Sequence, residues 1–158
     1  MSANKPSVLF VCLGNICRSP SAEAVFKKKA LDSGLDLTID SAGTAGYHKG
    51  GAPDKRSQDA GIERGYSFKG LKCRKVVEQD FEKYDYILGM DNQNIENLLK
   101  VCPEKFQHKV SLLLKFCVSE EQEIPDPYYS GKRGFEYVLD LIEIGVDGFI
   151  DYLKSNKI

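Results

Sequence analysis

A short apolar run near the N-terminus leads directly into a cysteine and a loop, and this feature constrains the fold more than any other. Residues Ser7–Val11 form the continuous apolar run expected of a central parallel strand that is buried on both faces. After a short loop, Pro20 opens a helical pattern that extends to Leu31. A strand that passes through a loop into a helix favours a parallel sheet with helical crossovers.

The same alternation continues along the chain. The apolar pattern predicts further strands at Leu37–Asp40, Tyr84–Leu88 and Val110–Leu114, and further helices at Asp54–Gly65, from Asp91 or Asn92 through Leu99, and at Phe135–Leu153. The 158 residues suffice for one sizeable core, and no repeat or linker divides them. We therefore predict one α/β domain over residues 1–158, with a four-stranded parallel sheet and helices on both faces.

The bulk composition excludes several classes of protein. A formal net charge of −1 gives the chain no general attraction to nucleic acid or to an anionic membrane. No apolar run is long enough to span a bilayer, and the N-terminal run is too short for a secretory signal. The five cysteines are an odd number in a chain too large for a disulfide scaffold, so we expect reduced thiols and a cytoplasmic location. Their spacing does not match a zinc site, and no metal or other cofactor is expected.

The loop after the first strand has the features of an anion-binding site. Gly14 and Asn15 tolerate left-handed backbone, which would let successive amides point inward. Ser19 is expected to cap the following helix and Pro20 to be its first residue, so that the positive end of the helix faces the same point. Arg18 adds a planar guanidinium that matches two phosphate oxygens. We predict a phosphate-binding loop after the first strand.

The same groups would act on the thiol of Cys12, which ends the strand. Helix N-termini and cationic neighbours favour the thiolate form of a cysteine, and a thiolate is a nucleophile that needs no histidine base. A buried structural cysteine beside an ordinary turn is the alternative interpretation. A nucleotide-binding loop is disfavoured, because neither GxxxxGK[ST] nor GxGxxG is present.

The predicted sheet also places other polar residues. Ligands of open parallel sheets bind beyond the carboxyl ends of the strands, and Cys12, Ser41 and Asp91 each lie at or just past such an end. Asp126 lies in the long loop after the last strand, between two prolines that restrict its backbone to extended conformations. A carboxyl fixed in this way suits general acid catalysis, whereas a solvated turn aspartate is the alternative.

With these residues in view, the chain resembles the low-molecular-weight protein tyrosine phosphatases from Val8 to about Leu153. The resemblance rests mainly on VCLGNICRSP, from Val11 to Pro20, and on DPYY, from Asp126 to Tyr129. Further matches are DSAGT from residue 40, YDYIL from residue 84 and the Met-Asp pair at residues 90 and 91. These segments occur in the order that the family shows.

The resemblance implies a protein tyrosine phosphatase that works without metal or cofactor through a phosphocysteine. Cys12 would attack phosphorus, Arg18 and the loop amides would hold the phosphate oxygens, and Asp126 would act as general acid and then as general base. Ser19 would stabilise the sulfur, and Asn15 would hold the loop together with Ser41. The residues implied to contact phosphate or to line the pocket are Leu13, Gly14, Asn15, Ile16, Cys17, Ser19, Tyr47, Tyr128 and Tyr129.

The family also implies partners and regulation. Phosphotyrosine-containing proteins or aryl phosphates would be the substrates, inorganic phosphate would be product and inhibitor, and the protein would act as a monomer. A reversible disulfide between Cys12 and Cys17 would give redox regulation, whereas a small packing residue is the alternative for Cys17. The chain departs from the family at Leu71, where many members carry a histidine.

Three other functions remain open at this point. An arsenate reductase shares the fold and loop, but it needs closely spaced downstream cysteines that this chain lacks. A phosphoarginine phosphatase would carry threonine in place of Ile16. A phosphate-binding module without catalysis is the third.

Overall fold

Four parallel strands form one sheet in the order β2-β1-β3-β4. The computed structural model describes residues 5–128 and 130–155. The strands are β1 (Ser7–Cys12), β2 (Thr38–Gly43), β3 (Tyr86–Gly89) and β4 (Val110–Leu112). The parallel sheet is as the sequence predicts. Because β1 lies between β2 and β3, it is buried along its whole length, which accounts for its unbroken apolar run.

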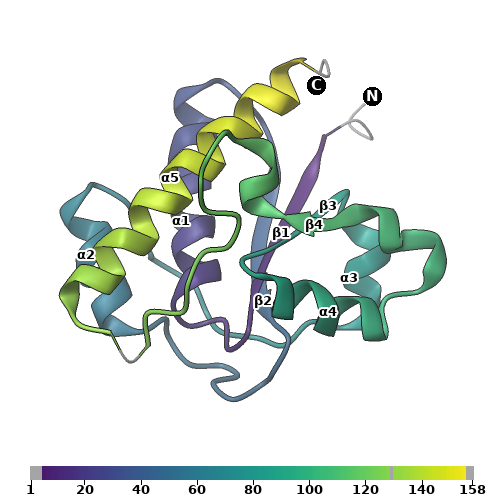
Figure 1. Cartoon of the computed structure of the whole chain (residues 1–158), viewed down its shortest axis with the longest axis horizontal. Helices are drawn as coiled ribbons and strands as arrows, with labels where there is room; N and C mark the ends of the chain where they lie inside the picture. Colours follow the sequence, from purple (N-terminus) through teal and green to yellow (C-terminus); the bar gives the residue numbers. More distant parts are fainter. Residues whose placement is uncertain (1–4, 129, 156–158) are drawn as a thin grey trace.

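Helices cover both faces of the sheet (Figure 1). One face carries α1 (Arg18–Asp32), α5 (Lys132–Ser155) and, beside them, α2 (Lys55–Glu63). The other face carries α3 (Glu78–Lys83) and α4 (Asn92–Val101). Side chains of β1 alternate between the two cores: Val8 and Phe10 pack with α1 and α5, whereas Leu9 and Val11 pack with α3 and α4.

The long helix α5 approaches a short 3₁₀ helix, η3 (Leu113–Phe116), more closely than its sequence indicates. Gly148 of α5 lies in this contact. A Cβ atom at this position would overlap the carbonyl oxygen of Phe116, so the glycine is what permits the approach. Gly145 faces Leu113 and Leu114 in the same contact.

The prediction missed three short elements, α3, η2 (Glu104–Lys109) and η3. Helix α3 has only 6 residues, too few to show a helical period, and begins where the Asp80 carboxylate accepts the backbone N–H of Val77. These elements explain two wrong strand boundaries. Tyr84 ends α3, so β3 begins at Tyr86, and Leu113 begins η3, so β4 ends at Leu112.

The loops that follow β1 and β2 lie together at the carboxyl edge of the sheet, at the lower end of the view in Figure 1. The long segment between η3 and α5 runs down beside α1 to the same end, while the amino end of β1 lies at the opposite end. Within the described part of the chain, no helix is both long and apolar enough to cross a membrane. The fold therefore brings the predicted site residues to one edge.

Candidate active site

The loop between β1 and α1 curls around the sulfur of Cys12. Asn15 has a φ of +57°, the left-handed conformation expected of it, whereas Gly14 does not have positive φ, so that part of the prediction was wrong. The curl also needs Gly43, at the end of β2. A Cβ atom on Gly43 would lie 2.7 Å from the carbonyl oxygen of Leu13 and 3.0 Å from the amide nitrogen of Asn15. The loop can therefore approach β2 only because residue 43 has no side chain.

Helix α1 begins earlier than predicted, and Ser19 is not its cap. The cap residue is Cys17, without a side-chain hydrogen bond, and Arg18 is the first helical residue. The Ser19 hydroxyl lies 3.1 Å from Cys12 Sγ, and the Ser19 amide donates to the same sulfur at 3.5 Å. The first turn of α1 therefore directs the backbone N–H and the hydroxyl of Ser19 toward the sulfur.

Two further side chains support this turn. Asn15 Nδ2 donates to Ser19 Oγ at 2.8 Å and to Ser41 Oγ at 3.0 Å. All three side chains are buried. Asn15, Ser19 and Ser41 thus form one connected group beneath Cys12, and Ser41 is the member of this group that was predicted to lie at the carboxyl edge.

Arg18 is almost wholly buried, with its side chain 3% exposed, and carboxylates fix its guanidinium from two loops. Its Nη1 lies 2.6 Å from Asp91 Oδ2 and donates to the carbonyl oxygen of Ile124 at 2.9 Å. Its Nη2 lies 3.8 Å from Asp126 Oδ2. Burial alone would lower the pKa of Arg18, but the charges of Cys12 and Asp91 outweigh burial and its pKa is raised. The group therefore stays a cation beside the sulfur.

A cavity of about 360 Å³ opens above the sulfur. Its lining consists of Cys12, Leu13, Gly14, Ile16, Cys17, Arg18, Tyr47, His48, Asp126 and Tyr128. Ser19 and Asn15 lie beneath it rather than in its wall. Tyr129 lies outside the described residues. His48 lines the cavity but was not predicted to do so, because its glycine-rich segment shows no pattern that indicates a site residue.

Asp126 and Tyr128 form one wall of this cavity. Asp126 is half exposed, and its Oδ1 accepts the Tyr128 backbone N–H at 3.0 Å. The Arg56 guanidinium lies 5.2 Å from the centre of the Tyr128 ring and 4.7 Å from that of Phe135. Asp54 holds the same guanidinium through two side-chain hydrogen bonds. Arg56 was not predicted, since only the fold brings α2 beside this loop.

Cys17 is a buried thiol in the wall of the cavity. The pKa of Cys17 is raised to about 12, mainly by burial. A hydrogen bond with Ser57 acts in the opposite direction and lowers this pKa. Burial likewise raises the pKa of Cys73 to about 11 and is the main cause of raised pKa values at Cys102 and Cys117. All five cysteines are free thiols.

Asp91, Arg74 and Glu23 are site residues that the sequence did not identify by role. Asp91 was expected at the edge and as a helix cap, and it is a cap, but its second oxygen holds Arg18. The backbone N–H of Arg74 donates to Asn15 Oδ1 at 2.9 Å, and Glu23 accepts from Ser41. Leu71, which stands where many members of the family carry a histidine, packs against the core on the α1 and α5 side.

Two negative observations limit the site. Among residues 5–128 and 130–155, no three His, Cys, Asp or Glu side chains gather as metal ligands would. A larger hollow of about 1380 Å³ lies near the amino ends of the strands, beside Asp85, Tyr86 and Tyr152, and shares no lining residue with the cysteine cavity.

A cysteine and an arginine held by a loop between a parallel strand and a helix define the class of cysteine-based phosphate-binding sites. Comparison with known proteins identifies the family. Residues 7–158 match the family model described as "Low molecular weight phosphotyrosine protein phosphatase". The chain therefore belongs to the low molecular weight phosphotyrosine protein phosphatase family.

Individual relatives are similar over almost the whole chain. The low molecular weight protein-tyrosine-phosphatase YfkJ of Bacillus subtilis is 42% identical over 154 residues, which cover 96% of this chain and 97% of YfkJ. A crystal structure of a protein tyrosine phosphatase from Entamoeba histolytica, with Hepes in its active site, has 43% identity and a TM-score of 0.93. It covers 98% of this chain and 100% of that one. The structure of Vibrio vulnificus Wzb in complex with benzylphosphonate has 27% identity and a TM-score of 0.85, over 95% and 100% of the two chains.

Proposed function

We propose that this protein is a protein tyrosine phosphatase that hydrolyses phosphotyrosine and aryl phosphates through a phosphocysteine on Cys12. One observation carries the proposal. Cys12 Sγ lies at the floor of a cavity, beside the buried cation of Arg18 and the hydroxyl of Ser19, and Asp126 lies in the wall of the same cavity. A nucleophile, an anion holder and a proton donor thus face one space.

In the first step, the Cys12 thiolate attacks phosphorus and the bond between phosphorus and the aryl oxygen breaks. Protonated Asp126 gives its proton to the departing phenolate. Arg18 and the loop amides hold the equatorial oxygens, whose charge they stabilise in the transition state. The products of this step are a phenol, a phosphocysteine and an ionised Asp126.

In the second step, the Asp126 carboxylate takes a proton from water as the water oxygen attacks phosphorus. The bond between phosphorus and sulfur breaks, and the sulfur leaves as a thiolate. A hydrogen bond from Ser19 to this sulfur makes it a better leaving group. Inorganic phosphate is released from the same loop, so it should inhibit as a product.

The walls of the cavity favour an aromatic substrate. Tyr47, Tyr128, Leu13 and Ile16 line the cavity above the sulfur and supply apolar surface there. A planar phenyl phosphate fits between such walls, whereas the short stem of phosphoserine would leave phosphorus short of the sulfur. The benzylphosphonate in the Wzb structure carries a phenyl ring one carbon away from phosphorus, and this supports the proposal.

Phosphotyrosine is also favoured over the other functions considered. Cys73 and Cys102 are both buried and separated along the chain, which does not suit the disulfide relay of an arsenate reductase. Ile16 at the cavity wall offers an apolar side chain to a phenyl ring rather than a hydroxyl to a phosphoarginine. The complete set of reacting groups argues against a binding module without catalysis.

We further propose that the protein acts as a monomer in the cytoplasm and that Cys17 protects Cys12 from oxidation by a reversible disulfide. Five free thiols suit a reducing compartment. The place of Cys17 in the same wall as Cys12 supports the redox role.

The first test measures hydrolysis of p-nitrophenyl phosphate by the purified protein in the presence of EDTA. We expect activity without metal and its loss in Cys12→Ser. Full activity in that variant would exclude the mechanism, and dependence on added metal would exclude the metal-independent reaction.

The role of Asp126 is tested with two leaving groups. Asp126→Ala should reduce hydrolysis of phenyl phosphate more than hydrolysis of p-nitrophenyl phosphate, because the better leaving group needs less protonation. Equal losses on both substrates would count against general acid catalysis by Asp126.

A further inference from the structure

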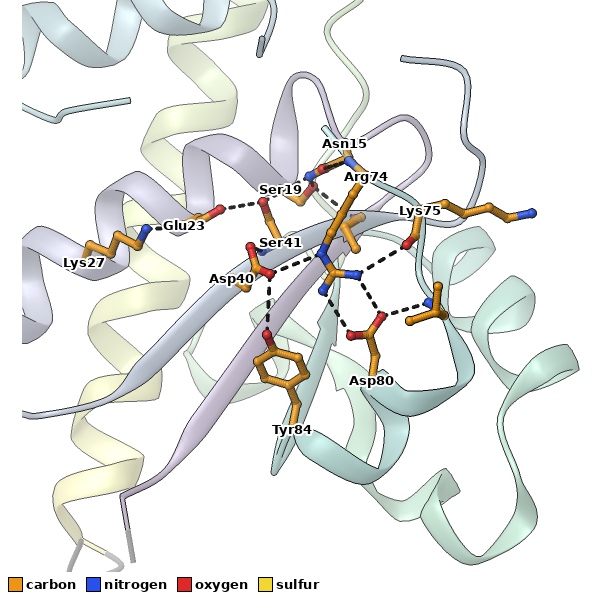
Figure 2. Close-up of polar contacts among 12 residues, drawn as sticks. Asn15, Ser19, Glu23, Lys27, Asp40, Ser41, Arg74, Lys75, Asp80 and Tyr84 are labelled. Carbon is orange, nitrogen blue, oxygen red and sulfur yellow. Dashed lines mark hydrogen bonds and ion pairs between the residues drawn. The ribbon is translucent and has the colours of Figure 1, made fainter. Parts of the chain in front are cut away.

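A buried carboxylate beneath the loop has no part in the mechanism above. Glu23 lies on α1 with its side chain 4% exposed, and its two oxygens have different partners (Figure 2). Oε1 accepts the Ser41 hydroxyl at 2.6 Å, and Oε2 lies 2.7 Å from Nζ of Lys27. Lys27 is half exposed and brings a cation from the surface to the buried carboxylate. A charge in such a position is costly unless it is paired, so its role needs an explanation.

Glu23 is the end of a hydrogen-bond chain that leads to Cys12. Ser41 gives its hydrogen to Glu23, so its oxygen is free to accept from Asn15 Nδ2. The second hydrogen of Nδ2 goes to Ser19 Oγ. Ser19 then has its own hydrogen left to give, and the nearest acceptor is Cys12 Sγ at 3.1 Å, ahead of the Ala42 carbonyl at 3.4 Å. The acceptor at Glu23 fixes Ser41 as an acceptor for Asn15, which is the first step of this chain.

Asn15 cannot reverse the chain by turning its amide. The backbone N–H of Arg74 donates to Asn15 Oδ1 at 2.9 Å, and a turned amide would place its NH₂ against this donor. The Arg74 segment is fixed in turn, because its guanidinium bonds both oxygens of Asp80 at 3.0 Å and one oxygen of Asp40 at 3.2 Å (Figure 2). Arg74 therefore fixes the direction of the Asn15 amide, and Glu23 fixes the direction of the Ser41 hydroxyl at the other end of the chain.

The charged groups around Glu23 act in opposite directions. Burial raises the pKa of the Glu23 carboxyl, and the nearby Asp40 adds to this, whereas the hydrogen bonds from Lys27 and Ser41 lower it. Arg74 forms an ion pair with Asp40 and neutralises its charge. Lys27 is thus the cation that favours the ionised, accept-only form of Glu23.

We propose that the Lys27–Glu23 pair is a positioning element for the reaction, which fixes the hydrogen-bond chain so that Ser19 donates to the sulfur of Cys12. This inference rests on the proposed phosphatase mechanism, in which Cys12 is nucleophile and leaving group. Neither residue touches the substrate. Their effect reaches the sulfur only through Ser41, Asn15 and Ser19.

The pair predicts a reciprocal rescue. In Glu23→Gln, Lys27 still points at the side-chain amide, so the amide turns its oxygen to Lys27 and its NH₂ to Ser41. Ser41 then has a buried hydrogen without an acceptor and no longer has a fixed orientation toward Asn15. We expect kcat to fall about tenfold, the size expected for loss of one hydrogen bond to a charged group. In the double variant Glu23→Gln, Lys27→Met, the amide oxygen is free to accept from Ser41, and kcat should return to within about threefold of the original.

The experiment measures kcat and KM for p-nitrophenyl phosphate, and inhibition by inorganic phosphate, in these variants. Lys28→Met is the matched control, because Lys28 pairs with Asp32 at the same spacing on the exposed side of α1. We expect no change in the control and less than about a twofold change in phosphate inhibition in every variant. A double variant no better than Glu23→Gln would overturn the proposal, as would a parallel loss of kcat and phosphate binding.

Two further readouts separate this proposal from the proposed function. Glu23→Gln should have no added effect in a Ser19→Ala background, and an additive loss would show that Glu23 does not act through Ser19. Alkylation of Cys12 by iodoacetamide at neutral pH needs no phosphatase activity, and it should slow in Glu23→Gln and recover in the double variant. Burial raises the pKa of the other four cysteines, so Cys12 is the thiol expected to react. An unchanged rate of alkylation would overturn the positioning role. If the unmutated protein had no phosphatase activity, only the proposed function would be overturned.

Discussion

The ion pair between Arg18 and Asp91 should contribute more to stability than an exposed pair of the same chemistry. The Arg18 side chain is 3% exposed and Asp91 is 21% exposed, and their atoms lie 2.6 Å apart. Removal of one partner from a buried pair costs about 3–5 kcal/mol, because it leaves a buried charge uncompensated. In Asp91→Asn the Ile124 carbonyl still accepts from Arg18, which reduces the expected cost to about 2 kcal/mol.

Asparagine has one side-chain oxygen in place of two, so it can keep the helix cap but loses the hydrogen bond from Arg18. Asp91 also caps α4 by accepting the Asn94 backbone N–H at 2.8 Å, and asparagine caps a helix about as well as aspartate. For a chain of 158 residues, about 2 kcal/mol corresponds to a fall in Tm of roughly 4–8 °C. Asp91→Ala should cost about 1 kcal/mol more, since it also removes the cap.

Urea unfolding and calorimetry measure both quantities. Asp140→Asn is the control, because Asp140 pairs with Arg64 at 2.9 Å but is 59% exposed, and we expect it to cost less than about 0.5 kcal/mol. If Asp91→Asn were no more destabilising than Asp140→Asn, the argument from burial of Arg18 would be refuted.

Three other predictions concern single residues. Gly148→Ala should lower the free energy of unfolding by more than about 2 kcal/mol, against the gain of about 1 kcal/mol from helix propensity, because the new methyl group overlaps an η3 carbonyl. A stabilised variant in urea unfolding would contradict this. Arg56→Leu should raise KM for aryl phosphates severalfold with little change in kcat, since Arg56 packs on Tyr128, and an unchanged KM would remove that role. After treatment with peroxide, dithiothreitol should restore the activity of the original protein but less than about half that of Cys17→Ala, and equal recovery would leave Cys17 as a packing residue.

Local patterns in the sequence predicted the first strand, the loop and α1 because the groups that shape them are neighbours in the chain. Asn15 adopts the expected left-handed conformation, and Cys12 and Arg18 reach one space from either end of a single loop. The predictions that Ser41 supports the loop and that Asp126 lies at the cavity came from the resemblance and from the positions of the strand ends. The structure brings both to the edge where the sequence placed them.

The contacts that the sequence did not reveal depend on register and on helix packing. Arg74 reaches Asn15 only because its segment lies beside the end of β2, and no local pattern marks that approach. Glu23 looks like an ordinary helix residue, and only the packing of α1 on β2 brings it to Ser41. Ser19 fits the pattern of a helix cap, but its hydroxyl is held by Asn15 and Cys12 instead, and this competition was not evident from the order of residues.

The most direct test of the account is to look for phosphate on the sulfur of Cys12 during turnover. The protein is mixed with radiolabelled aryl phosphate, denatured within the first turnovers and cleaved into peptides, and the label is located by mass spectrometry. We predict label on the peptide that contains Cys12 and none in Cys12→Ser. Rapid hydrolysis with no label on Cys12, or with label on another residue, would contradict a phosphocysteine mechanism.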